Sequence, residues 1–183
     1  MNKEIISKIF IDKTGNVIKK INGISNDKII EIKLNGDVLS NDDKLKKLHE
    51  QFPTKSKMLS KYYLYVISFA ETVPFHIIST ARQKFIEERS NKSANFSRNN
   101  EEHTDTCNVY VGTSMDIKSR FRTHLGLGSG TTTWALYLKK WVEEGDIIIK
   151  VIPLVDFLED ESQLIEDIIW NSLKPMFGKK GGK

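Results

Sequence analysis

Apolar and polar positions divide the chain into a first part with short alternating segments and a second part with longer, more regular ones. The first part, residues 1–58, contains "KIFIDKTGNVIKKI" and "KIIEIKLNGDVL", in which β-branched residues flank the turn signals "TGN" and "NGD". These patterns predict β-hairpins. The stretch "NDDKLKKLHEQF" predicts a short helix that ends before Pro53. We therefore expect a β-rich N-terminal extension over residues 1–58, made of hairpins plus a short helix.

The second part, residues 59–183, combines apolar runs typical of strands with segments of helical periodicity. The predicted strands are "YYLYVISF", "CNVYVG" and "DIIIKVIPLV". The predicted helices are "PFHIISTARQKFIEERS", "SMDIKSRFRTHL", "TWALYLKKWVEEG" and "EDESQLIEDIIWNSLKPMF". We interpret the glycine-rich "GLGSG" as a flexible connector between helices, because no Lys-Ser or Lys-Thr follows it. The predicted fold class is α+β: a small, mostly antiparallel three-stranded sheet flanked by helices.

Composition indicates a soluble protein of the cytoplasm. Of the 183 residues, 28% are charged and 39% are hydrophobic, and no apolar run approaches the roughly 18–20 residues that a membrane span needs. A single cysteine, Cys107, excludes an internal disulfide framework. The net charge of +4 is concentrated between residues 108 and 142, which contain five basic residues and one acidic residue. That local excess favours an anionic partner over a membrane.

Three sets of side chains are candidates for a site, and each set also has an ordinary structural interpretation. Arg120 and His124 are one helical turn apart beside an apolar stripe, so they are either solvated surface residues or members of a site at the end of the preceding strand. Glu166 borders the apolar face of the last helix, where a carboxylate requires either an ion pair or a metal. Tyr65 and Tyr110 stand on predicted strands, where tyrosines are usually packing residues.

Taken in chain order, these residues and their flanking motifs resemble those of the GIY-YIG nuclease superfamily. The match consists of "YLY" at 63–65, "YVGTSMDIKSRFRTH" at 110–124, Glu166 on a later helix and a final "LKPMFG", and it covers roughly residues 62–180. The first motif lacks its usual glycine, and Gly178 stands where many members have an asparagine. The two strands that carry the motifs are also separated by an insertion at about 70–106.

The resemblance implies a metal-dependent endonuclease that hydrolyses phosphodiester bonds in double-stranded DNA. Glu166 would bind one Mg²⁺ or Mn²⁺ ion and Arg120 would hold the scissile phosphate. Tyr65 would act as the base with Tyr110 as its partner, and His124 would relay the proton or bind phosphate. An insertion within the catalytic domain suggests a site-specific restriction enzyme, and cutting both strands would require a homodimer or two sequential nicks. The alternative is a non-catalytic nucleic-acid-binding module that retains the fold.

Basic residues of the insertion, of the two helices after the second motif and of the C-terminus are the expected DNA contacts. They are Arg82, Lys84, Arg89, Arg98, Lys118, Arg122, Lys139, Lys140, Lys179 and Lys180.

Overall fold

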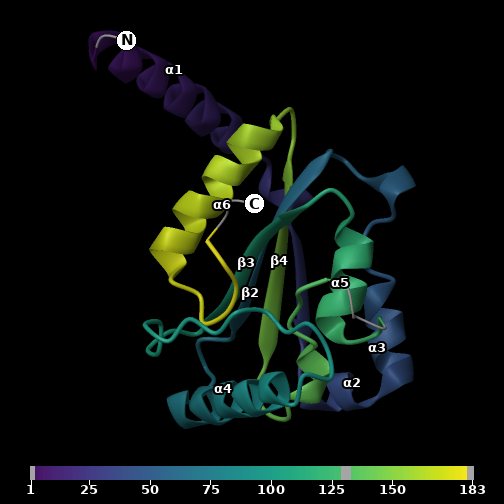
Figure 1. Ribbon diagram of the computed structural model, residues 1–183. Coiled ribbons are helices and arrows are strands. Elements are labelled where there is room, and N and C mark those ends of the chain that lie inside the picture. The colour runs from purple at the N-terminus through teal and green to yellow at the C-terminus, as the bar shows by residue number, and fades with distance from the viewer. Residues whose placement is uncertain (1–2, 129–132, 181–183) are drawn as a thin grey trace.

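A four-stranded antiparallel sheet forms the centre of the protein. The computed structural model describes residues 3–128 and 133–180, and it shows the strands in the order β1 (Ile30–Leu34), β4 (Ile147–Leu154), β2 (Tyr62–Phe69) and β3 (Asn108–Ser114) (Figure 1). All neighbouring strands are antiparallel. The α+β class is confirmed, but the sheet has four strands rather than the predicted three. The additional strand, β1, comes from the segment assigned to the N-terminal extension and pairs with β4.

The two hairpins predicted before residue 40 do not form. Residues 3–22 are instead one helix, α1 (Lys3–Asn22), because Val17 on its buried side packs in the same apolar cluster as Ile165 of α6 (Glu159–Leu173). The "NGD" turn signal opens another helix, α2 (Gly36–Ser40): the side chain of Asn35 accepts a hydrogen bond from Val38 N at 3.1 Å. Residues that favour turns also favour helix N-caps, and here the cap is formed.

Helices cover both faces of the sheet (Figure 1). The alternate side chains of β2 that include Tyr65 and Ile67 share one apolar cluster with three helices: α3 (Asp42–His49), α4 (Phe75–Ser90) and α5 (Ile117–Leu125). The other side chains of β2, such as Leu64, pack with α6 and α1. Period-two alternation in "YYLYVISF" thus serves two buried faces, which explains why the run is apolar throughout.

The predicted helix at 133–145 is reduced to a single 3₁₀ turn, η3 (Leu138–Lys140). Tyr137 has φ +52°, which interrupts a right-handed helix, and Ala135 pairs with Phe96 of the insertion. Most apolar residues of this segment are nevertheless in the core: Leu138 and Trp141 are fully buried, and Trp134 is the exception. Part of the predicted glycine-rich connector, residues 129 and 130, lies outside the described residues.

The insertion at 70–106 packs against the rest of the protein through α4 and the loop that follows it. Phe85 of α4 stacks on Phe177 with ring centroids 3.7 Å apart. Asn99 forms an antiparallel bridge with Phe177, and Gly178 N donates to Arg98 O at 2.9 Å. The insertion therefore forms part of the core together with the C-terminal segment. Within the described residues, no helix is both long and apolar enough to span a membrane.

Candidate functional site

Arg120 of α5 lies between two tyrosine hydroxyls. Its Nε donates to the Tyr65 hydroxyl of β2 at 2.9 Å, and one Nη2 hydrogen is donated to the Tyr110 hydroxyl of β3 at 3.1 Å. A third hydrogen bond runs from Nη1 to the carbonyl of Trp134 at 2.8 Å. Burial disfavours the charged guanidinium, but the two tyrosine oxygens more than offset this, and the pKa of Arg120 lies above its ordinary value. Arg120 is therefore a fixed cation.

The close approach of the two tyrosines depends on Gly112. Tyr65 pairs with Gly112 across the strands, and Tyr110 pairs with Ile67, so both rings are on the α5 face of the sheet. Their planes are within 9° of parallel, with centroids 5.9 Å apart. A Cβ added at Gly112 would lie 2.6 Å from the Tyr65 hydroxyl oxygen and 2.9 Å from a ring carbon of Tyr110. The glycine of "YVG" thus provides the space that the two rings occupy.

His124, one helical turn after Arg120, is completely buried and contacts the hydroxyl of Tyr65. Its Nδ1 accepts a hydrogen bond from Leu136 N at 3.3 Å, so its Nε2 carries the proton and donates it to the Tyr65 hydroxyl at 3.1 Å. Burial, and next the charge of Arg120, hold the pKa of His124 well below its usual range. The histidine is consequently neutral at pH 7.

The two tyrosines differ in their access to water. Tyr65 is 1% exposed, and burial raises its pKa in spite of the neighbouring Arg120. Tyr110 is only partly buried. Of these two hydroxyl groups, only that of Tyr110 belongs to a residue with appreciable contact with solvent.

The carboxylate of Glu166 approaches β3 from the opposite face of the sheet. Its carboxylate accepts hydrogen bonds from the hydroxyl of Thr113, at 2.6 Å, and from the backbone of Thr113 on edge strand β3. Thr113 pairs with Leu64, so its side chain points toward α6, whereas Arg120 comes from the α5 side. Burial raises the pKa of Glu166, which the bonds from Thr113 oppose. The five predicted catalytic residues are therefore gathered around one edge strand.

The structure also tests the ion-pair interpretation of Glu166. Among the described residues, Glu166 has no Lys, Arg or His nitrogen within 4.0 Å, and no group of three or more His, Cys, Asp and Glu side chains is placed to hold a metal. A cation at this position would take one protein carboxylate and complete its coordination with water and substrate oxygens. Mg²⁺ is commonly bound in that way.

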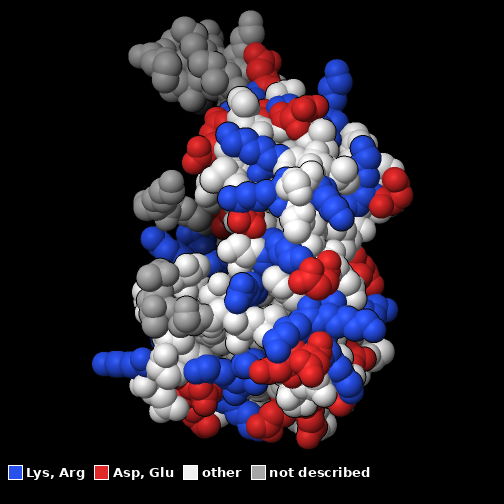
Figure 2. All heavy atoms as spheres, turned by 90° about the vertical axis from the view of Figure 1, so that its right-hand side faces the viewer, with Lys and Arg blue, Asp and Glu red and all other residues white. Residues whose placement is uncertain are grey.

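The predicted DNA-contacting residues fall into separate groups. Four form ion pairs with acidic residues: Lys84 with Glu143, Lys118 with Glu50, Lys139 with Asp42, and Lys140 with Glu88. On the face that Figure 2 shows, basic and acidic side chains are correspondingly interspersed. Arg82 donates hydrogen bonds to the carbonyls of Asn100 and His103, and so holds the loop after α4. Arg122 is exposed, and the remaining four line a pocket: Arg89, Arg98, Lys179 and Lys180.

Three contacts of the site were not predicted from the sequence. Thr113 binds Glu166, and the backbone of Trp134 holds Arg120 while 61% of this residue remains exposed. Gly178, with φ +105°, lies against the ring of Tyr110, where an added Cβ would be 2.8 Å from a ring carbon. The glycine in "PMFG" was a signal for this last contact, because a close approach of backbone to an aromatic ring favours glycine.

Comparisons of the chain with protein-family models, with curated proteins and with solved structures find no match.

Proposed function

We propose that this protein is a metal-dependent endonuclease that hydrolyses phosphodiester bonds in DNA, with a site of the GIY-YIG type. The observation that carries the proposal is the position of Arg120, held by two tyrosine hydroxyls on one side of edge strand β3 while Glu166 approaches from the other. Phosphodiester hydrolysis requires a cation on the phosphate, a base for the water and a ligand for a metal ion. This cluster contains one residue suited to each task.

Arg120 retains the hydrogen-bonding capacity to bind a phosphate. A guanidinium has five N–H groups, and three of them are donated to Tyr65, Tyr110 and the Trp134 carbonyl. One hydrogen remains on each terminal nitrogen. These two N–H groups can donate to phosphate oxygens. The protein contacts therefore fix the side chain and leave two of its donors for a phosphate.

Tyr110, rather than Tyr65, is the base in this proposal, which reverses the order expected from the resemblance. A buried, neutral phenol that receives hydrogen bonds from Arg120 and His124 is suited to positioning the guanidinium. Tyr110 receives a hydrogen bond from the same cation and is in contact with solvent. Of the two hydroxyl oxygens, that of Tyr110 is therefore the one placed to accept a proton from the attacking water.

Glu166 is the residue that would hold the metal ion, Mg²⁺ or Mn²⁺. A carboxylate has about four acceptor positions. Thr113 occupies two of them, so the donor set fits a hard cation that keeps most of its water. When bound, such an ion supplies positive charge to the phosphate oxygens and lowers the pKa of a bound water. Action on double-stranded DNA as a site-specific restriction enzyme, with a homodimer cutting both strands, is the narrower form of this proposal.

A plasmid-nicking assay tests the proposed function. Purified protein is incubated with supercoiled plasmid and Mg²⁺ or Mn²⁺, beside variants Glu166→Gln, Arg120→Gln, Tyr110→Phe and Tyr65→Phe. We expect the first three variants to lose cleavage by about 10²-fold or more, the order of a general-base contribution. Tyr65→Phe should lose less than Tyr110→Phe, because it retains the base. Lys47→Gln is the control, since Lys47 is exposed on α3 and is not among the expected DNA contacts.

The outcomes separate the proposal from its alternative. Cleavage by the wild type that Glu166→Gln and Arg120→Gln retain would show that the activity belongs to another site or a contaminant. Binding of DNA without cleavage under any metal would favour a non-catalytic binding module. A loss in Tyr65→Phe greater than in Tyr110→Phe would restore Tyr65 as the base.

A further inference from the structure

A pocket of about 520 Å³ lies beside the candidate site, between the loop after α4, the end of α6 and the C-terminal segment. Its basic wall consists of Arg89, Arg98, Lys179 and Lys180, and its aromatic wall consists of His103 and Trp170. Glu101 and Glu102 also line it, so basic side chains outnumber acidic ones by two to one. The pocket is therefore a polar, cationic depression.

The positive charge of this pocket is less neutralised than that of the four predicted DNA contacts that form ion pairs. Within the part of the chain that the structure describes, Arg98, Arg89 and Lys180 have no carboxylate within 4.0 Å. By contrast, Lys118 and Lys139 each form an ion pair. Because a guanidinium or ammonium without a partner keeps its full capacity to bind an anion, the pocket is where a phosphate would gain most.

The pocket wall is fixed by hydrogen bonds between segments far apart in the sequence. Arg82 donates to the carbonyls of Asn100 and His103, at 2.8 and 3.2 Å. Asn100 Nδ2 and His103 Nδ1 both bind the carbonyl of Pro175, each at 2.9 Å. The backbone of Arg98 accepts a hydrogen bond from Gly178. The insertion and the C-terminal segment therefore present their basic side chains from a preorganised frame.

Trp170 adds a second, independent sign of a ligand. Its ring lies 5.1 Å from that of His103, and its indole nitrogen is buried without a hydrogen-bond partner among the described residues. A buried donor without a partner is costly, and a bound group beside it offers the missing acceptor.

The pocket adjoins the proposed catalytic residues through two contacts. Trp170 comes one helical turn after Glu166 on α6, and Gly178, which precedes Lys179, lies against the ring of Tyr110. We propose that this pocket binds a backbone phosphate of the DNA strand next to the scissile phosphate. The identity of the ligand rests on the proposed function, whereas the pocket itself rests on the charges and contacts described above.

Binding measured without cleavage tests this inference. A fluorescent DNA duplex is titrated with the full-length Glu166→Gln protein between 50 and 200 mM salt, alone and with Arg98→Gln or Lys180→Gln added. We expect each added change to weaken binding by about tenfold, the effect of one lost charged hydrogen bond, and to reduce the salt slope by about one. Lys47→Gln removes the same charge from an exposed position on α3 that forms no ion pair within the described residues, and it is the matched control.

Tryptophan fluorescence gives a second readout that does not depend on charge. We expect a single-stranded oligonucleotide to change the emission of the Glu166→Gln protein, and Trp170→Phe to remove most of that change. Inorganic phosphate is titrated in parallel to separate a general anion site from one that requires the polymer; saturation by inorganic phosphate at equal affinity would overturn assignment to a DNA strand.

The two proposals fail in different ways. If the wild type cuts plasmid but Arg98→Gln and Lys180→Gln behave like Lys47→Gln, the pocket proposal is wrong and the nuclease proposal stands. If the duplex binds through the pocket residues but no metal supports cleavage, the pocket stands and the enzymatic proposal is wrong. A wild type that neither binds nor cuts DNA contradicts both.

Discussion

Arg120 gives up most of its conformational freedom in the folded protein, because hydrogen bonds to Tyr65, Tyr110 and Trp134 fix its guanidinium from three directions. Ordering an arginine side chain costs about 2 kcal/mol. That cost is met during folding rather than during binding, so a phosphate finds the guanidinium already oriented. Lysine cannot replace this geometry, since an ammonium has no planar fork.

The spacing in the sequence predicted that the side chains of Arg120 and His124 point the same way, but not how deeply each is buried. The i, i+4 relation places both on one side of α5, and the structure brings both to Tyr65. The sequence could not indicate that His124 is fully buried, because its burial depends on Leu136 from a segment predicted to be helical. The exposure of Trp134 was not predicted either, because this residue belongs to the same segment that was predicted to be helical.

The buried neutral state of His124 predicts a particular pH dependence of stability. Its folded pKa is depressed, so below about pH 6.5 the unfolded chain takes up a proton that the folded protein does not. Stability from this group is therefore complete above pH 6.5 and falls as the pH drops below it. We expect urea unfolding to show a smaller loss between pH 7.5 and pH 5.5 in His124→Gln than in the wild type.

His76→Gln is the control for this measurement, because His76 is exposed. An equal pH dependence in the wild type and His124→Gln would contradict the assignment of the loss to His124.

At the scale of elements, periodicity identified most helices and strands correctly. Local turn signals gave wrong predictions where tertiary contacts determine the secondary structure. The strands β2, β3 and β4 and the helices α3, α4, α5 and α6 form near their predicted positions. Residues 3–22 form a helix rather than a hairpin because side chains such as Asn16 and Lys20 reach α6, which sequence patterns do not reveal. Likewise, β1 is a short strand whose partner, β4, is remote in the sequence.

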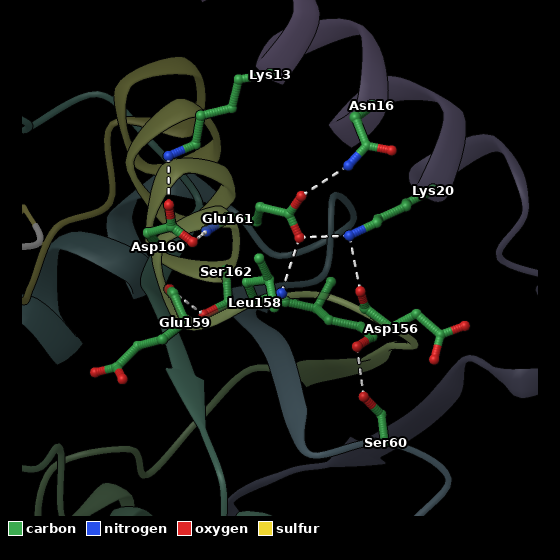
Figure 3. Close-up of polar contacts among 11 residues, drawn as sticks. Lys13, Asn16, Lys20, Ser60, Asp156, Leu158, Glu159, Asp160, Glu161 and Ser162 are labelled. Carbon is green, nitrogen blue, oxygen red and sulfur yellow. Dashed lines mark hydrogen bonds and ion pairs between the residues drawn. The ribbon is translucent and has the colours of Figure 1, made fainter.

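The contact between α1 and α6 includes one buried and one exposed ion pair (Figure 3). Glu161, whose side chain is 4% exposed, binds Lys20 at 2.6 Å and Asn16 at 3.0 Å, and accepts a hydrogen bond from Leu158 N at the start of α6. The Lys13–Asp160 pair lies in solvent. Only the first pair leaves a buried charge unpaired when it is broken.

We expect Glu161→Ala to lower the free energy of unfolding by about 2–3 kcal/mol, because it removes three hydrogen bonds and leaves Lys20 without its carboxylate partner. Asp160→Ala, its exposed neighbour, should have a much smaller effect. Urea unfolding followed by circular dichroism measures both. Equal losses in the two variants would show that the buried pair does not hold α1 in place.

At the scale of the whole molecule, the position of charge matters more than the net charge of +4. The local excess of basic residues at 108–142 led to a predicted DNA surface there, yet Lys118 and Lys139 pair with acidic residues from the N-terminal half of the chain. Such pairing arises only from the fold, because Glu50 and Asp42 are remote in sequence. The sequence could therefore provide the number of charges but not their distribution.

This distribution predicts unequal effects of equal changes in charge. Lys118→Gln and Lys139→Gln should weaken DNA binding by no more than about twofold, because each lysine is already shared with a carboxylate. Arg98→Gln, which removes the same charge from the pocket, should weaken it several times more. Anisotropy titrations at one salt concentration compare the three. Equal losses would indicate that DNA responds to the overall charge alone.

The strand order β1-β4-β2-β3 also has a consequence for the synthesis of the chain. Because Tyr65 pairs with Gly112 on one side and Val151 on the other, β2 leaves the ribosome long before either partner. A nascent chain that has not reached β4 exposes "YYLYVISF", a run without charge or proline that is prone to self-association. Until both β3 and β4 have been synthesised, the sheet cannot cover this strand.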